Sequence, residues 1–127
     1  MSNNNQNQDD LGTIKIANEV VAIIAGLAAT EVEGVAGMSG GIVGGIADML
    51  GRKNLSKGVK VEVGELDCSV DIYVIVEYGS AIPYVAWNIQ DNVRQAIESM
   101  TGLEVIEINV HVQGVHFGDE EEIEEEE

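Results

Sequence analysis

The stretch SVDIYVIVEYGSAIPYVAWNIQDNVRQAIESMTGLEVIEINVHVQGVH (69–116) decides the fold, because its pattern is strand, helix, strand. Its middle part, 82–101, keeps a 3.6-residue apolar period through Ile82, Val85, Ile89, Val93, Ala96, Ile97 and Met100. We expect Ser80 to cap this helix, Pro83 to fit its first turn and Gly102 to end it. Residues 69–78 and 103–116 alternate apolar and polar side chains and predict strands, with Gly114 a bulge or strand end.

Working outward, VKVEV (59–63) alternates strictly and predicts another strand, joined to the next by GELD (64–67), which suits a hairpin. TIKI (13–16) and residues 35–38 predict two short strands, and residues 17–32 predict a second helix that ends near a glycine. The whole pattern predicts an α+β fold. We expect a two-layer sandwich with a mixed, mainly antiparallel sheet of three to five strands and two main helices on one face.

The helix over 17–32 has an unusual distribution of side chains. Val20, Ile23, Ile24 and Leu27 recur at i, i+3, i+4 and i+7 and predict its buried stripe. The opposite side would then consist of Ala22, Ala25, Gly26 and Ala29, where a solvent-facing helix normally carries charge. We therefore expect a second helix or a second chain to pack closely on this alanine face.

The charge of the chain sits mostly at its ends. The 127 residues carry a net charge of −17, of which residues 1–10 contribute −2, 11–118 contribute −7 and 119–127 contribute −8. We expect a disordered polar N-terminus over 1–11, a single domain over 12–118 and a disordered acidic tail over 119–127. The tail is either a solvated device for solubility or a segment for partner binding or autoinhibition. So acidic a chain argues against a nucleic-acid binder.

The search for reactive chemistry finds little. The phosphate-loop and dinucleotide-binding glycine patterns are absent, and Cys68 has no partner for a disulfide and no neighbouring base to lower its pKa. His111 lies with Asn109 and Gln113 on the polar face of its strand, and the odd spacing to His116 predicts opposite faces. We predict no catalytic, metal or cofactor site. No membrane span or signal peptide is evident either, which favours a cytoplasmic protein.

Three features suggest contact surfaces instead. Tyr84 and Trp87 are expected on the outer face of the helix over 82–101, as an aromatic pair typical of interfaces, unless a loop or the glycine-rich segment covers them. The glycine-rich segment 34–58 contains a candidate amphipathic helix over 42–50, followed by the basic cluster of Arg52, Lys53, Lys57 and Lys60. The motifs GMSG (37–40) and GIVG (41–44) fit the GxxG loop of RNA-binding modules, though the segment around them is uncharged.

Several runs of the chain together resemble a known family. These are IKIANEVVAIIAGLAATEVEGVAGM (14–38), KGVKVEV (57–63), VDIYVIVEYG (70–79) and IPYVAWNIQDNVRQAIESMTGLEVIEINVHVQGV (82–115). They resemble the alkaline shock protein family of Gram-positive bacteria, the general stress or cell-envelope stress response proteins, over residues 11–117. The resemblance implies a small cytosolic, non-enzymatic protein of envelope homeostasis that self-associates, with a membrane-anchoring protein as a partner.

Residues and resemblance together predict a scaffold or adaptor. Contacts between copies are assigned to Tyr84, Trp87, Ala22, Ala25 and Ala29, and docking of an anionic partner to Arg52, Lys53 and Lys57. The alternative is a module that binds RNA or a small anionic ligand through the glycine-rich loop and the basic cluster.

Overall fold

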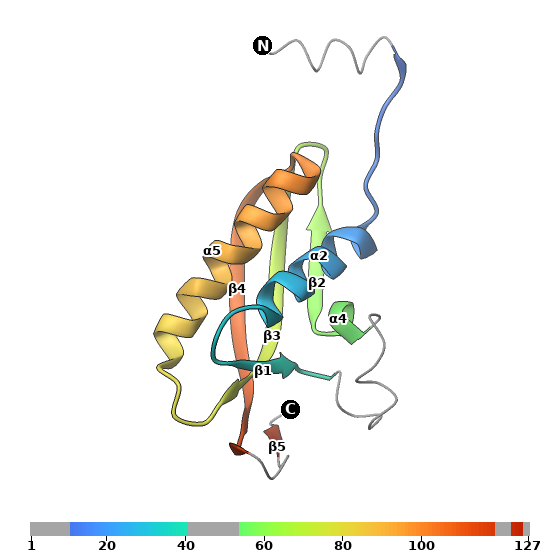
Figure 1. Ribbon diagram of the computed structural model, residues 1–127. Helices are drawn as coiled ribbons and strands as arrows, with labels where there is room; N and C mark the ends of the chain where they lie inside the picture. The colour runs from blue at the N-terminus through green and yellow to red at the C-terminus, as the bar shows by residue number, and fades with distance from the viewer. Residues whose placement is uncertain (1–10, 41–53, 119–122, 126–127) are drawn as a thin grey trace.

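The computed structural model describes residues 11–40, 54–118 and 123–125 (Figure 1). In chain order the elements are α2 (Asn18–Thr30), β1 (Val35–Met38), α4 (Asn54–Lys57), β2 (Val59–Val63), β3 (Asp67–Glu77), α5 (Ile82–Thr101), β4 (Glu104–His116) and β5 (Ile123–Glu125). Helices α2 and α5 contact each other and cover one face of the sheet. The predicted α+β sandwich is confirmed.

Strand β3 is the centre of the sheet, because both of its edges are paired. Strands β2 and β1 lie one after the other along one edge, both antiparallel to β3. Strand β4 lies along the other edge, parallel to β3 over its whole length, and β5 pairs antiparallel with the end of β4. The sheet is therefore mixed and mainly antiparallel, as expected, but its longest pairing is the parallel one.

Helix α5 is the crossover that a parallel pair of strands requires. It has the expected bounds and ends at Gly102, which adopts a left-handed φ of 80°. Its buried stripe is Val85, Ile89, Val93 and Ile97. Ile82 and Met100, expected in that stripe, lie in the first and last turns of the helix and are exposed.

The connections before and after β3 were predicted from their residues, and one of the two predictions is wrong. The predicted hairpin between β2 and β3 is confirmed, with the Gly64 N–H donating to the Asp67 carbonyl at 2.7 Å. The expected cap by Ser80 is wrong. Ala81 is the N-cap residue of α5, and its methyl side chain cannot make a cap bond. Ser80 lies one residue before the cap, where its N–H closes a turn on the Glu77 carbonyl.

Strand β4 contains two irregularities relative to β3. The register skips Ile106 and again Gln113, so each is one extra residue in β4. The second one confirms the bulge predicted at Gly114, one residue away. Each extra residue reverses the alternation of side chains, which moves every later residue to the other face of the strand.

Two expectations for the ends of the domain are corrected. Residues 13–16 form no strand, and they pair with none of the described strands. Three residues of the tail expected to be disordered, Ile123–Glu125, form β5 against β4. The helix predicted over 42–50 lies outside the described residues.

Candidate interaction surfaces

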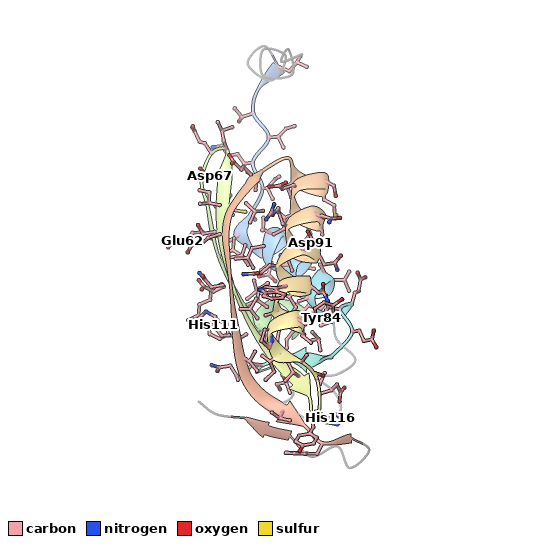
Figure 2. All side chains as sticks on the ribbon, turned by 90° about the vertical axis from the view of Figure 1, so that its left-hand side faces the viewer. Glu62, Asp67, Tyr84, Asp91, His111 and His116 are labelled. Atoms are coloured by element: carbon pink, nitrogen blue, oxygen red, sulfur yellow. The ribbon has the colours of Figure 1, made fainter. Side chains whose placement is uncertain are left out.

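The outer face of α5 presents aromatic side chains to solvent. Tyr84 is 62% exposed and Trp87 is 63% exposed, and no described residue covers them. One turn further on, Asp91 accepts a hydrogen bond from the Gln95 amide at 3.0 Å, and Arg94 is exposed beside it. Figure 2 shows Tyr84 and Asp91 on the helix layer, away from the sheet. The predicted exposure of this pair is confirmed, and its role in contacts stays a prediction.

Helix α2 buries a different side from the one that the sequence predicted. Ala22, Ala25 and Ala29 are 6%, 0% and 0% exposed, whereas Val20 and Leu27 are 47% and 40% exposed. The alanine face therefore packs inside this same chain and is not available to a second copy. The physical reason is distance: small side chains allow the helix backbone to approach its neighbours closely, and the larger side chains fit only at the rim.

The closest of these approaches is between α2 and α4. A Cβ added at Gly26 would lie 2.8 Å from the carbonyl carbon of Leu55 and closer still to its oxygen. On the other side of α2, the Asn92 amide of α5 donates to the Ala28 carbonyl at 2.8 Å. The partner predicted for the alanine face is thus found within the chain, in α5, α4 and the sheet.

The basic cluster is described only in part. Lys57 is exposed at the end of α4, and Lys60 projects from β2 with its Nζ 5.6 Å from the centre of the Tyr73 ring. Arg52 and Lys53 lie outside the described residues. The two described lysines lie near each other in sequence, but Lys60 belongs to the open face of the sheet.

That open face carries a polar cluster that sequence analysis did not assemble. Figure 2 shows Glu62 and His111 on the side of the sheet opposite the helices. There the Asp71 carboxylate meets His111 Nε2 at 3.0 Å and accepts a bond from the Asn109 amide at 3.1 Å. The Tyr73 and His111 rings are stacked at 4.3 Å between centroids. We call Lys60, Asp71, Tyr73, Glu107, Asn109 and His111 the open-face cluster.

The electrostatics of this cluster centre on Asp71. The hydrogen bond from His111 is the largest of the causes that hold the pKa of the Asp71 carboxyl below its usual range, and the Asn109 amide and Lys60 add to it. Because Asp71 and His111 are each 38% exposed, water screens the pair and its contribution is modest. The cluster links three strands side by side. Alternation had placed Asn109 and His111 on the polar face, but their partner Asp71 follows only from the β3–β4 register.

The second histidine pairs elsewhere. His116 Nδ1 lies 2.9 Å from Glu77 Oε1 at the end of the β3–β4 pair, next to the Tyr78 and Phe117 rings. The expectation of opposite faces for the two histidines rested on unbroken alternation, and the extra residue Gln113 breaks it. Each histidine nevertheless contacts a carboxylate of its own, Asp71 for His111 and Glu77 for His116.

Reactive groups are otherwise scarce in the described part of the chain. Cys68 is buried, and burial, with a lesser effect of Asp67 and Glu98, raises the pKa of its thiol. Within residues 11–40, 54–118 and 123–125, no three His, Cys, Asp or Glu side chains gather to hold a metal ion. The described helices include none that is long and apolar enough to cross a membrane.

The fold and these surfaces define a small α+β domain whose distinctive exposed features are an aromatic helix face and a hydrogen-bonded polar sheet face. Residues 6–117 match the model of the alkaline shock protein family, which is described by a cell envelope-related function, and the chain belongs to this family. The resemblance drawn from the sequence is confirmed.

Individual relatives agree with this assignment. The chain is 44% identical over 107 residues to the protein YqhY of Bacillus subtilis, covering 84% of this chain and 79% of that protein. It is 34% identical over 102 residues to a stress response regulator gls24 homolog of Streptococcus pyogenes, covering 80% of this chain and 57% of that protein. Among solved structures, the MamM CTD in a cadmium form has a TM-score of 0.47 and 15% identity, covering 76% of this chain and 96% of that one.

Proposed function

We propose that this protein is a non-enzymatic adaptor of the cell-envelope stress response, which self-associates and docks on a membrane-anchored partner. It would act in the cytoplasm, at the inner face of the membrane through that partner. The observation that carries the proposal is the exposed Tyr84 and Trp87 pair on α5. Membership of a family with a cell envelope-related function supports the cellular setting.

The chemistry of the α5 face suits a contact between proteins. Tryptophan, tyrosine and arginine are the residues that most often carry binding energy at interfaces. Trp87 is the one tryptophan of the chain, and an exposed tryptophan leaves about 150 Å² or more of ring surface in contact with water when it has no partner. Asp91 and Arg94 flank it and would set the orientation of the partner.

The proposal is tested by truncating the aromatic pair. We expect Trp87→Ala, and to a smaller degree Tyr84→Ala, to weaken association between copies and recovery of the protein with washed membranes. For an interface anchor the loss is at least about 2 kcal/mol, which corresponds to roughly 30-fold in the dissociation constant. Light scattering over a concentration series and co-sedimentation with membranes measure the two effects.

The same helix supplies the control. Ser99→Ala removes an exposed hydroxyl three turns from Trp87 that bonds only the Ala96 carbonyl of the same helix, and it should leave both measurements unchanged. If Trp87→Ala behaves like Ser99→Ala in both assays, the α5 face is not the contact surface. Binding of RNA that is lost with Lys57→Gln and with rising salt would instead favour the anionic-ligand alternative.

A further inference from the structure

The outer edge of β4 is a second surface of interest, and its geometry follows from the backbone hydrogen bonds. The His116 carbonyl accepts the Tyr78 N–H at 2.9 Å, so the backbone of His116 points toward β3. Successive residues of a strand point their backbone groups to alternate sides, so those of Val115 point outward. Val115 lies opposite Glu124 of β5, which is the central pair of that short ladder.

The same argument identifies the open part of this edge. The Ile108 carbonyl accepts the Gln90 side-chain amide of α5 at 3.0 Å, so it points to the outer edge and is already occupied. By alternation Val110 and Val112 also point their N–H and C=O groups outward. Among the described strands, β4 pairs only with β3 and β5, and β5 reaches only Gly114, Val115 and His116. Val110 and Val112 are therefore left without a strand partner on that side.

The outer edge of β4 carries no acidic side chain over its last eight residues. These residues, NVHVQGVH (109–116), include the open part and the part that β5 covers, in a chain that has 23 aspartates and glutamates. The nearby carboxylates of Asp71 and Glu77 on β3 each contact one of its histidines. An uncharged, unpaired strand edge readily pairs with another strand, and most proteins cover or charge such edges.

Strand β5 is held only weakly on the outer edge of β4. It is three residues long, and residues 119–127 around it carry eight carboxylates that repel one another. Figure 1 shows it at the lower end of β4. A cover this short can leave the edge without disturbing the β3–β4 pairing or the helix layer.

We propose that β5 is a removable cover of the β4 edge, and that the uncovered edge pairs antiparallel with the same edge of a second copy. An antiparallel pairing about Val110 is self-complementary, because Val110 faces itself and Val112 faces Ile108, whose carbonyl can accept a second bond. In that register the start of the second copy's β4 would occupy the place that β5 holds along Gly114, Val115 and His116. The absence of carboxylates lets two such edges approach where the remaining surface repels. The tail thus limits association through the sheet, which is separate from contacts at the α5 face.

The first experiment compares the full chain with a chain that ends at Gly118, both carrying Trp87→Ala so that α5 contacts do not contribute. Light scattering over a concentration series should give about 13.5 kDa for the full chain and twice its own monomer mass for the shortened one. Equal monomers would overturn the edge proposal while leaving the proposed function intact. Shortened chains that associate only when Trp87 is present would assign the contact to α5 and also overturn it.

A second pair of variants separates strand pairing from loss of charge. In the full chain with Trp87→Ala, Glu124→Pro removes the N–H opposite Val115, whereas Glu124→Gln removes the same charge and keeps that N–H. We expect dimers with Glu124→Pro and monomers with Glu124→Gln. Equal association of the two variants would mean that the tail acts by charge alone, which contradicts the proposal.

A third pair tests the edge itself in the shortened chain. Val112→Pro removes an outward N–H that the β3–β4 ladder does not use, and Val112→Ala shortens the side chain without removing that N–H. We expect Val112→Pro to weaken dimerisation by roughly tenfold or more, as two net hydrogen bonds are lost across the two-fold axis. Circular dichroism checks that both fold. Dimers of unchanged strength in a folded Val112→Pro chain would overturn the proposal, and the Glu124 pair decides if that variant does not fold.

Discussion

Among single residues, Asp71 shows how one carboxylate can organise a sheet face. It is the shared partner of His111 and Asn109, so it ties β3 to β4 through side chains as well as through the backbone. Tyr73 stacks on the same histidine and lies beneath Lys60 of β2. Removal of the Asp71 carboxylate would therefore leave His111 without this partner and Asn109 with the Glu107 carboxylate alone.

We expect Asp71→Asn to lower the free energy of unfolding at pH 7 by about 0.5–1 kcal/mol, the lower part of the range for a net hydrogen bond, because the pair is partly exposed. Because the pKa of Asp71 is lower in the native state, its contribution is complete above the unfolded-state pKa of about 3.9 and is lost as the pH falls through the native value. The difference between variant and parent should therefore shrink toward pH 3. Urea unfolding at the two pH values measures it.

Glu62→Gln is the matched control for this prediction. It removes a carboxylate from the same face of the sheet, and no hydrogen bond or ion pair to another described side chain involves it. A difference for Asp71→Asn that persists unchanged at pH 3, or that Glu62→Gln reproduces, would show that the contact with His111 does not stabilise the fold.

Among the secondary-structure elements, the two long helices show when an apolar pattern is enough to predict which face of a helix is buried. Helix α5 was predicted with its observed bounds, because charged and amide side chains mark its outer face unambiguously. Helix α2 is apolar on all sides, and two stripes satisfy the same spacing: the expected one from Val20 to Leu27 and the observed one from Val21 to Ala28. From the sequence, the stripe with the larger side chains was predicted to be buried because it is the more hydrophobic one. The structure buries the stripe with the smaller side chains because α2 packs closely against its neighbours.

Other misses have equally local causes. The strand at Ile123–Glu125 could not be predicted from a glutamate run, because its partner is the free edge of β4 and not a pattern of its own. Residues 13–16 had a strand pattern, but a run of four residues is too short to require pairing, and they lie unpaired before α2. The open-face cluster depends on which residues of β3 and β4 stand side by side, and two extra residues in β4 set that register.

The close approach of α2 and α4 yields a prediction at this scale. We expect Gly26→Ala to lower the free energy of unfolding by about 1–3 kcal/mol, because the new methyl group would meet the Leu55 backbone, which cannot move as a side chain would. Gly37→Ala in β1 is the control, since nothing lies within 4 Å of the added Cβ. Thermal unfolding measures the stability of both variants. Equal stability would show that α4 moves away from the added methyl group at little cost.

The large negative charge of the whole chain affects the stability of its folded state. A net charge of −17 on 127 residues opposes the compact state through self-repulsion, and −8 of it belongs to residues 119–127. The pairing of β5 with β4 places Glu124 and Glu125 beside the acidic domain. Folding therefore brings part of the negative charge of the tail toward charges of the same sign.

Salt should relieve this repulsion, because the screening length falls from about 10 Å at 0.1 M to about 3 Å at 1 M. We expect the melting temperature of the full chain to rise with sodium chloride over that range, and the chain ending at Gly118 to show a clearly smaller rise, both measured at low protein concentration where copies stay apart. The comparison cancels the general effect of salt on hydrophobic burial, since the two chains share residues 1–118. Equal slopes would mean that the tail charges are not felt by the folded domain, and that β5 is held to β4 without an electrostatic cost.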